Sequence, residues 1–225
     1  YGLILSDSYW VPSEGYTIAE QKSWNNTPIS EIDNVEELIF YKRFLRPVMV
    51  SLRNCKNVLL QGIIFQNSPA WNLHPLMCEN IIIDNIFVKN PSYAVNGDAI
   101  DLESCKNALI INSIFDAGDD GICIKSGKDR DGRRRGIPCQ NVVVDGCTVF
   151  SGHGGFVIGS EMSGDVRNIK VNNCQFLGTD NGLRFKSARG RGGVVENIFI
   201  ENISMKDIKK DAITFNLYYF SNKAN

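Results

Sequence analysis

The sequence has neither a long hydrophobic run nor an excess of one charge, and each absence excludes a class of protein. No stretch of about 18 apolar residues occurs, so no segment is predicted to span a membrane. Lys and Arg number 24 against 25 Asp and Glu, so no overall basic field exists to hold nucleic acid. A local group of cations can still bind an acidic polymer. Residues 1–10 lack a basic start and an unbroken apolar stretch, so no signal peptide is predicted in this chain.

A repeat runs through most of the chain and predicts its fold. Six segments begin with Asn, continue as a short β-branched strand and reach Gly or Asn five residues later. The leading residues are Asn57, Asn80, Asn107, Asn141, Asn168 and Asn197. Their spacings of 23, 27, 34, 27 and 29 residues are typical of solenoid coils with loops of varying length. Asn or Gly at a fixed bend suits a positive φ, and stacked Asn side chains can hydrogen-bond along the stack.

A second pattern, a small residue followed by apolar, variable and apolar positions, gives every coil at least one more strand. It occurs at residues 70–73, 99–102, 121–124, 155–158, 182–185 and 212–215. Period-2 alternation directs Ile100 and Leu102 inward and Asp101 outward. No stretch of about ten residues shows helical spacing. The predicted fold is all-β, a right-handed, single-stranded parallel β-helix.

Two regions are predicted along the chain. Residues 1–47 lack the repeat and are expected to form an irregular N-terminal segment, which can cap the open end of the solenoid. Residues 48–225 are expected to form the β-helix domain. The sequence stops just after a repeat strand without a cap, so we expect this domain to be truncated at its C-terminus.

Six of the seven cysteines follow the same repeat. Four lie two residues before the repeat Asn and two lie six residues after it; these are Cys55, Cys78, Cys105 and Cys139, then Cys147 and Cys174. No Cys-x-x-Cys spacing typical of metal or redox sites occurs. We interpret the cysteines as small buried residues. Disulfides between neighbouring coils stay open, and the cysteines do not indicate a cellular compartment.

Charged side chains collect on one outer strip of the predicted solenoid. The position before the small residue is occupied in turn by Pro69, Asp98, Asp120, Gly154, Asn181 and Asp211. Equivalent positions on adjacent coils lie about 4.8 Å apart, so Asp98 and Asp120 are predicted to be neighbours. Other polar residues of the strip are Asp119, His153, Arg184, Lys186, Tyr218 and Tyr219. A single Asp usually caps a turn, but three on adjacent coils repel one another and indicate a functional cluster.

Close carboxyl groups are what glycoside hydrolysis requires. One carboxylic acid protonates the leaving oxygen while another carboxylate activates water. Crowding raises the pKa of one carboxyl group and keeps its proton available at mildly acidic pH. The neighbouring Arg184 and Lys186 suggest that the sugar itself carries a carboxylate. The spacing of adjacent coils does not separate inverting from retaining geometry.

Four motifs on this strip resemble those of glycoside hydrolase family 28, the polygalacturonases. They are Asn96-Gly97-Asp98 for Asn-Thr-Asp, Asp119-Asp120 for the Asp pair, Gly152-His153-Gly154 for Gly-His-Gly and Arg184-Phe185-Lys186 for Arg-Ile-Lys. Their order and coil-by-coil placement agree with the family across residues 54–219. One such motif is a weak signal, whereas four in order on one solenoid face are a strong one.

The resemblance implies a pectin-type polygalacturonase that cleaves α-1,4-galacturonosyl bonds with inversion and without a metal or other cofactor. Asp119 would be the general acid, Asp98 and Asp120 would hold and activate water, and His153 would support protonation of the acid. The residues implied to contact the acidic polysaccharide are Asn96, Arg184, Lys186 and Tyr219, with Tyr218 a less favoured choice. The resemblance also implies a secreted or periplasmic location. The oligomeric state is not indicated.

The sequence departs from the family pattern at three positions. Gly97 replaces Thr, Gly121 replaces the usual Cys, and Phe185 replaces Ile. The Asn-Gly-Asp motif and residues 158–164 resemble bacterial members, several of which act from chain ends. The basic loop at residues 128–136 either walls off the cleft and grips a terminal uronate or is a solvated loop. Exo and endo action both stay open.

Three rival functions remain at this stage. A pectate lyase is also a β-solenoid, and the carboxylates could hold its calcium through oxygen ligands. A non-catalytic carbohydrate-binding solenoid would not need Asp119 as an acid. A hydrolase of the same family could act instead on rhamnogalacturonan or xylogalacturonan.

Overall fold

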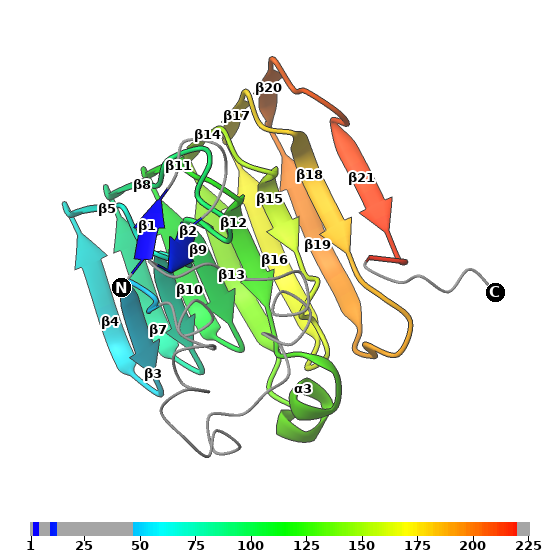
Figure 1. Cartoon of the computed structure of the whole chain (residues 1–225). Helices are drawn as coiled ribbons and strands as arrows, with labels where there is room; N and C mark the ends of the chain where they lie inside the picture. Colours follow the sequence, from blue (N-terminus) through cyan, green and yellow to red (C-terminus); the bar gives the residue numbers. More distant parts are fainter. Residues whose placement is uncertain (1, 5–9, 13–46, 220–225) are drawn as a thin grey trace.

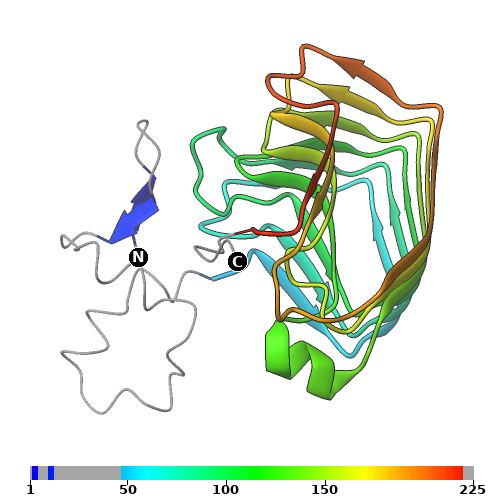
Figure 2. The same cartoon turned by 90° about the vertical axis from the view of Figure 1, so that its right-hand side faces the viewer.

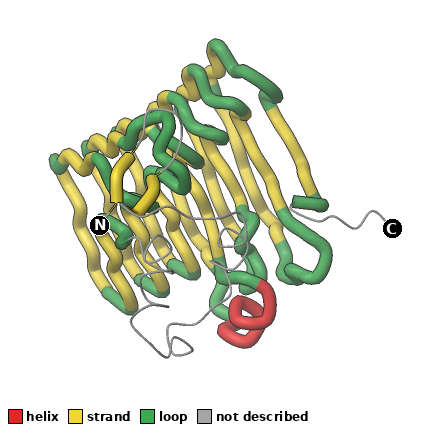
Figure 3. The backbone as a smooth tube through the Cα atoms, in the orientation of Figure 1, coloured by secondary structure: helices red, strands yellow, loops and turns green. Residues whose placement is uncertain are grey.

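The computed structural model describes residues 2–4, 10–12 and 47–219. Apart from one short antiparallel pair, β1 (Gly2–Ile4) with β2 (Trp10–Pro12), the described strands form a parallel β-solenoid (Figures 1 and 3). This confirms the predicted fold class. Most of the predicted N-terminal segment, and with it the predicted cap, lies outside the described residues.

Each full coil contributes one strand to each of three parallel sheets (Figure 2). Sheet 1 contains β3 (Val50–Arg53), β6 (Leu73–Leu76), β9 (Ile100–Glu103), β12 (Asp120–Lys125), β15 (Gly154–Ile158), β18 (Asn181–Lys186) and β21 (Ile213–Asn216). Sheet 2 contains β4 (Lys56–Gln61), β7 (Glu79–Asp84), β10 (Lys106–Ile111), β13 (Cys139–Asp145), β16 (Val166–Asn172) and β19 (Val195–Glu201). Sheet 3 contains β5 (Ile64–Gln66), β8 (Phe87–Lys89), β11 (Ile114–Asp116), β14 (Thr148–Phe150), β17 (Gln175–Leu177) and β20 (Ser204–Lys206).

The core lies between the three sheets and consists of stacked apolar side chains. Successive coils align Ile100 with Ile122 in sheet 1 and Phe115 with Val149 in sheet 3, and all four are fully buried. Each such side chain contributes about 1.5–3 kcal/mol by leaving water. The alternation fixes which side chains face outward, and so places the polar strip of sheet 1.

Asn side chains form the predicted ladder along the bend that leads into sheet 2. The six repeat Asn residues have φ between 54° and 59°. Each one from Asn80 onward donates a hydrogen bond of 3.0–3.1 Å from Nδ2 to the Oδ1 of its equivalent one coil earlier. Asn tolerates this left-handed conformation better than other non-glycine residues, and its amide provides one donor and one acceptor per step. The ladder therefore helps to keep the coils in register.

The cysteines stack inside the solenoid as predicted. All seven are free, and six of them are buried. The backbone N–H of Cys55 points at Cys78 Sγ and that of Cys78 at Cys105 Sγ, each at 3.4 Å. Burial raises the pKa of the Cys139 thiol to about 12. These thiols are packing residues.

The second coil has a different register from the predicted one. Leu73 pairs with Ile100, and Asn72 N–H donates to the Asp98 carbonyl at 2.9 Å, so Trp71 and not Pro69 is aligned with Asp98. The prediction was wrong by two residues. A two-residue shift leaves every side chain on the same face, so the alternation could not distinguish the two registers.

The basic loop contains α3 (Asp129–Arg135), a helix that the periodicity did not predict. Arg135 binds Glu103 at 2.7 Å, and Asp129 accepts a hydrogen bond of 2.8 Å from Arg191. The loop is therefore docked on neighbouring coils and is not freely solvated. No helix among the described residues has the length and apolar character needed to cross a bilayer.

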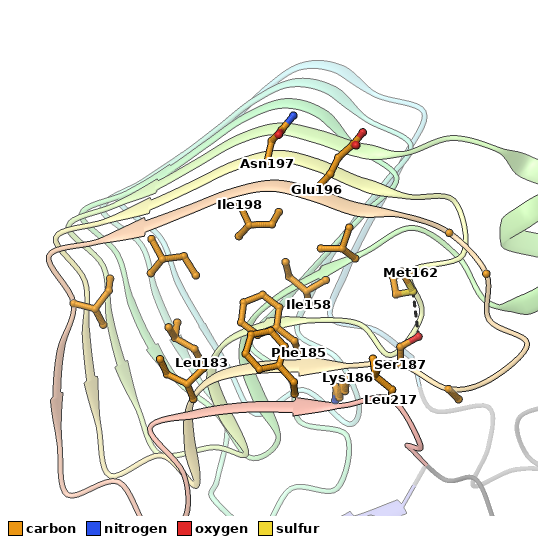
Figure 4. Close-up of a pocket in the computed structure, with 18 of the residues that line it drawn as sticks. Ile158, Met162, Leu183, Phe185, Lys186, Ser187, Glu196, Asn197, Ile198 and Leu217 are labelled. Carbon is orange, nitrogen blue, oxygen red and sulfur yellow. Dashed lines mark hydrogen bonds between the residues drawn. The ribbon is translucent and has the colours of Figure 1, made fainter. Parts of the chain in front are cut away.

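An apolar cavity of about 1090 Å³ opens where the core meets the last described strands (Figure 4). Ile158, Leu183 and Phe185 line it, and Phe185 stacks on Phe215 with ring centroids 4.6 Å apart. Its lining is largely that of a solenoid core. The predicted site lies instead on the outer face of sheet 1.

Candidate active site

Three aspartates converge on the outer face of sheet 1. Asp98 ends the turn before β9, and Asp120 begins β12 in the aligned position, where its carbonyl accepts a 2.9 Å hydrogen bond from Ala99 N–H. Oxygen atoms of Asp98, Asp119 and Asp120 all lie within 4.8 Å of one another. Gly121 faces the core, where a Cβ would lie 2.5 Å from Val149 Cγ1, so the chain can present Asp120 outward. The predicted neighbourhood of these carboxylates is confirmed.

Two cations from a distant coil hold Asp120. Arg184 Nη1 lies 3.1 Å from one carboxylate oxygen and Lys186 Nζ hydrogen-bonds the other. Asp120 is fully buried and Lys186 nearly so. Burial acts to lower the pKa of Lys186, but negative charges around it, that of Asp120 above all, together raise that pKa above its ordinary value. Both cations face outward from the core as predicted, yet they are engaged with a carboxylate that lies two coils away.

His153 and Asp119 form a second pair. His153 Nδ1 lies 2.9 Å from Asp119 Oδ1, and the His153 N–H donates to the Asp119 carbonyl at 2.7 Å. Gly152 makes this approach possible, because its φ is 88° and a Cβ there would lie 2.4 Å from the same carbonyl. Burial raises the pKa of Asp119, but the His153 hydrogen bond and charge lower it further, and its pKa lies below the ordinary value. The hydrogen bond to Asp119 raises the pKa of His153.

Replacing His153 by Gln is expected to lower the free energy of unfolding by less than about 1 kcal/mol, because the imidazole is half exposed. The pKa of His153 is raised by folding, so its contribution is full below the unfolded value of about 6.5 and is lost as pH rises through the folded pKa. The pKa of Asp119 is lowered, so its contribution is present above about 3.9 and is lost as pH falls through the folded pKa. Urea unfolding of both proteins across pH should therefore show the largest difference between about pH 4 and 6.5. A difference that grows toward pH 9 would contradict the pairing.

Asp98 has the opposite tendency to Asp119. Burial raises the pKa of Asp98 well above its ordinary value, and the charges of Asp101, Asp119 and Asp120 raise it further. Neighbouring carboxyl groups whose pKa values are driven apart are typical of acid–base sites. The cluster can therefore hold protonated and ionised carboxyl groups side by side at one pH.

The structure brings the remaining predicted residues to the same region. The ring of Tyr219 has Lys186 Nζ 4.9 Å and Arg184 Cζ 5.5 Å from its centroid. Tyr218 is 53% exposed and faces Arg189 instead, which favours Tyr219 as the substrate contact. Asn96 has φ 54° in the turn two residues before Asp98. All eight predicted site residues thus lie on or beside the strip.

Sequence reasoning did not include several polar residues of this face. Lys125 lies in a buried position with its Nζ 2.8 Å from Glu161 and 3.3 Å from Asp101. The same ammonium lies 4.8 Å from the ring centroid of Trp71. The alternation of β9 and β12 does direct Asp101 and Lys125 outward, so that signal was available. Glu161 lies within residues 158–164, in a loop outside the repeat, so the alternation gave no signal for it.

The carboxylates have the spacing of metal ligands, but two of them already pair with side-chain cations. Within the described part of the chain, two groups of donors are close enough to share an ion: Asp98 with Asp119 and Asp120, and Asp98 with Asp101 and Cys123. Asp120 is already paired with Arg184 and Lys186, and Asp101 with Lys125. Calcium requires about six to eight oxygen ligands, so this donor set fits side-chain cations better than Ca²⁺.

Comparison with known proteins adds independent evidence. The family model for glycosyl hydrolases family 28 matches residues 41–225. A probable polygalacturonase from Vitis vinifera is 32% identical over 168 residues, 74% of this chain and 34% of the relative. An exo-poly-alpha-D-galacturonosidase from Dickeya chrysanthemi is 30% identical over 177 residues, 79% of this chain and 29% of the relative. The chain thus spans about a third of the length of these relatives.

A solved structure shows the same fold. The crystal structure of a hyperthermoactive exopolygalacturonase from Thermotoga maritima matches with a TM-score of 0.78 at 41% sequence identity. The match covers 91% of this chain and 45% of that chain. The polar strip therefore lies on a fold that is shared with an enzyme of known class.

Proposed function

Since the chain belongs to glycosyl hydrolases family 28, we propose that it hydrolyses α-1,4-galacturonosyl bonds of polygalacturonate or pectin, with inversion and without a metal cofactor. The observation that carries this proposal is the cluster of Asp98, Asp119 and Asp120 beside Arg184 and Lys186. The carboxyl groups supply acid and base, and the cations suit a sugar that carries a carboxylate. The relatives named polygalacturonases support the same substrate class.

Asp119 is the proposed general acid. The pKa of Asp119 is lowered and that of His153 is raised. Between these two pKa values the Asp119–His153 pair shares one proton. A substrate carboxylate that arrives beside these groups adds negative charge, which raises the pKa of Asp119 and moves the shared proton toward it. That proton can then be transferred to the leaving oxygen.

Asp120 is the proposed base, with Asp98 beside it to hold the attacking water. The carboxylate oxygens lie closer than the roughly 6.5–9.5 Å typical of inverting enzymes, and this distance alone would favour retention. Both Asp120 oxygens, however, bind Arg184 and Lys186, and burial raises the pKa of Asp98. Neither group is a good nucleophile in that state, so we propose proton transfer from water and inversion. Arg184, Lys186 and Tyr219 then contact the substrate uronate, with Asn96 at the turn.

Product analysis tests the proposal. The full natural protein is incubated with polygalacturonate in the presence of a chelator, and reducing ends, ultraviolet absorbance and the anomer formed first are recorded. We expect reducing ends without unsaturated, absorbing product, at a rate that the chelator does not change, and an inverted first anomer. Calcium-dependent, absorbing product would identify a lyase instead.

The sizes of the products show where the polymer is cut: release of monomer alone would mean exo action, and mixed oligomers would mean endo action. Parallel assays on rhamnogalacturonan and xylogalacturonan distinguish which polymer is hydrolysed.

We further propose that the protein acts where this polymer occurs, outside the cytoplasm as a secreted or periplasmic enzyme. The proposed partner is the acidic polysaccharide, and neither nucleic acid nor a membrane is expected to bind. The near-neutral charge of the chain, 24 basic against 25 acidic residues, supports that expectation.

A further inference from the structure

A fourth carboxylate, that of Asp101, lies beside the cluster. Asp101 is fully buried in β9, and among the described residues its carboxylate has no hydrogen-bond partner apart from its ion-pair contact with Lys125. Oxygen atoms of Asp98 and Asp101 and the Sγ of Cys123 lie within 4.8 Å of one another. Lys125 Nζ lies 3.3 Å from Asp101 Oδ1. Asp101 therefore contacts a buried cation and lies close to Asp98.

Such a group is costly to the fold. A buried carboxylate without hydrogen bonds loses its hydration without a full replacement, and one ion pair with a shared ammonium compensates only in part. Asn, Thr or Val would fit the outward position of a strand at lower cost. Since the fold does not need the charge of Asp101, its position next to Asp98 indicates a role in the chemistry of the site.

We propose that Asp101 is a positioning residue for Asp98: Asp101, which pairs with Lys125, sets the pH at which Asp98 loses its proton. The catalytic meaning of this inference rests on the proposed function, but the interaction itself does not. In the resting site, Asp98 then carries a proton and orients water, while Asp120 accepts the proton that the water releases.

The charged groups around Asp101 come from every neighbouring element. His74 of β6 faces it from the preceding coil, Asp120 and Lys125 from the following coil, and Asp98 from its own. Burial raises the pKa of Asp101 to about 7, against the lowering effect of Lys125 and His74. Among charges, Asp101 is the largest cause of the raised pKa of Asp98, while Lys125 lowers it. Asp101 and Lys125 therefore shift the pKa of Asp98 in opposite directions.

Carboxyl ¹³C NMR of protein labelled at aspartate tests this directly, with the Asp98 resonance identified by its loss in Asp98→Asn. In Asp101→Asn, which keeps the shape and removes the charge, the titration midpoint of Asp98 should fall by roughly one to two pH units. In Lys125→Met the midpoint should rise, by a smaller amount than it falls in Asp101→Asn. Cys123→Ser is the matched control, because it changes the third member of the group without changing charge, and it should leave the midpoint unchanged.

Shifts in the same direction for Asp101→Asn and Lys125→Met would indicate a packing disturbance and overturn the proposal, as would no shift in the isosteric Asp101→Asn. If Lys125→Met does not fold, Asp101→Asn still decides. The pH profile of kcat/KM on polygalacturonate gives a second measurement, in which the limb governed by Asp98 should move to lower pH in Asp101→Asn. A protein that does not hydrolyse the polymer would refute the proposed function, while the NMR titration would still decide on Asp101.

Discussion

Asp119→Asn is expected to reduce turnover by at least about 10²-fold while the solenoid stays folded. General acids contribute about 10²–10⁴-fold, and an amide cannot protonate the leaving oxygen. The amide oxygen can still accept the hydrogen bond that His153 now gives to Asp119 Oδ1, so the local structure should persist. Because the lost interaction belongs to the transition state, kcat should fall while KM changes little. Release of reducing ends and thermal unfolding measure the two quantities.

Asp84→Asn is a matched control for this substitution. Asp84 is a half-buried carboxylate at the end of β7, on sheet 2, where it accepts hydrogen bonds from Gln61 and Asn112. It is remote from the strip on sheet 1, so its replacement should leave turnover unchanged. If Asp119→Asn kept more than about a tenth of the turnover, Asp119 would not be the general acid. Carbohydrate binding without any turnover in the parent protein would favour a non-catalytic solenoid.

The fold could be predicted because its determinants are local and periodic. Each coil carries its own Asn bend, β-branched strand and small inward residue, so one coil is enough to recognise the next. Superposition of the coils then placed Asp98 beside Asp120 without any knowledge of long-range contacts. The stacked cysteines followed from the same rule.

The errors arose where the repeat carries no information. A two-residue shift keeps the alternation, so the sequence could not show that Trp71 is aligned with Asp98. The strand register predicts the face to which a side chain points. It does not predict how far a long side chain such as that of Lys extends along that face. Lys186 therefore had the predicted direction and an unpredicted partner two coils away. Glu161 lies in a loop outside the repeat. The helix α3 also lies outside the repeat, and its seven residues are too few to show a clear period.

The pairing of Lys186 with Asp120 links the stability of the site to its chemistry. Removing one member of a buried ion pair leaves the other charge without a partner, which costs about 3–5 kcal/mol. Lys186→Met should therefore lower the free energy of unfolding by about 3 kcal/mol, near the lower limit because Arg184 remains on Asp120. The proposed uronate contact is lost as well, so KM should rise. Denaturant unfolding and initial rates measure these two effects.

Two further variants distinguish the ion pair from simple loss of packing. Lys210→Met removes a partner of Asp180 from an exposed pair, and should change stability by less than about 1 kcal/mol. Adding Asp120→Asn to Lys186→Met removes both charges, so much of the lost stability should return, whereas activity should not. If Lys186→Met were as mild as Lys210→Met, the contact between Lys186 and Asp120 would not be a stabilising ion pair. The base would then lack the cations that fix its orientation, and the proposed division of roles between Asp120 and Asp98 would be wrong.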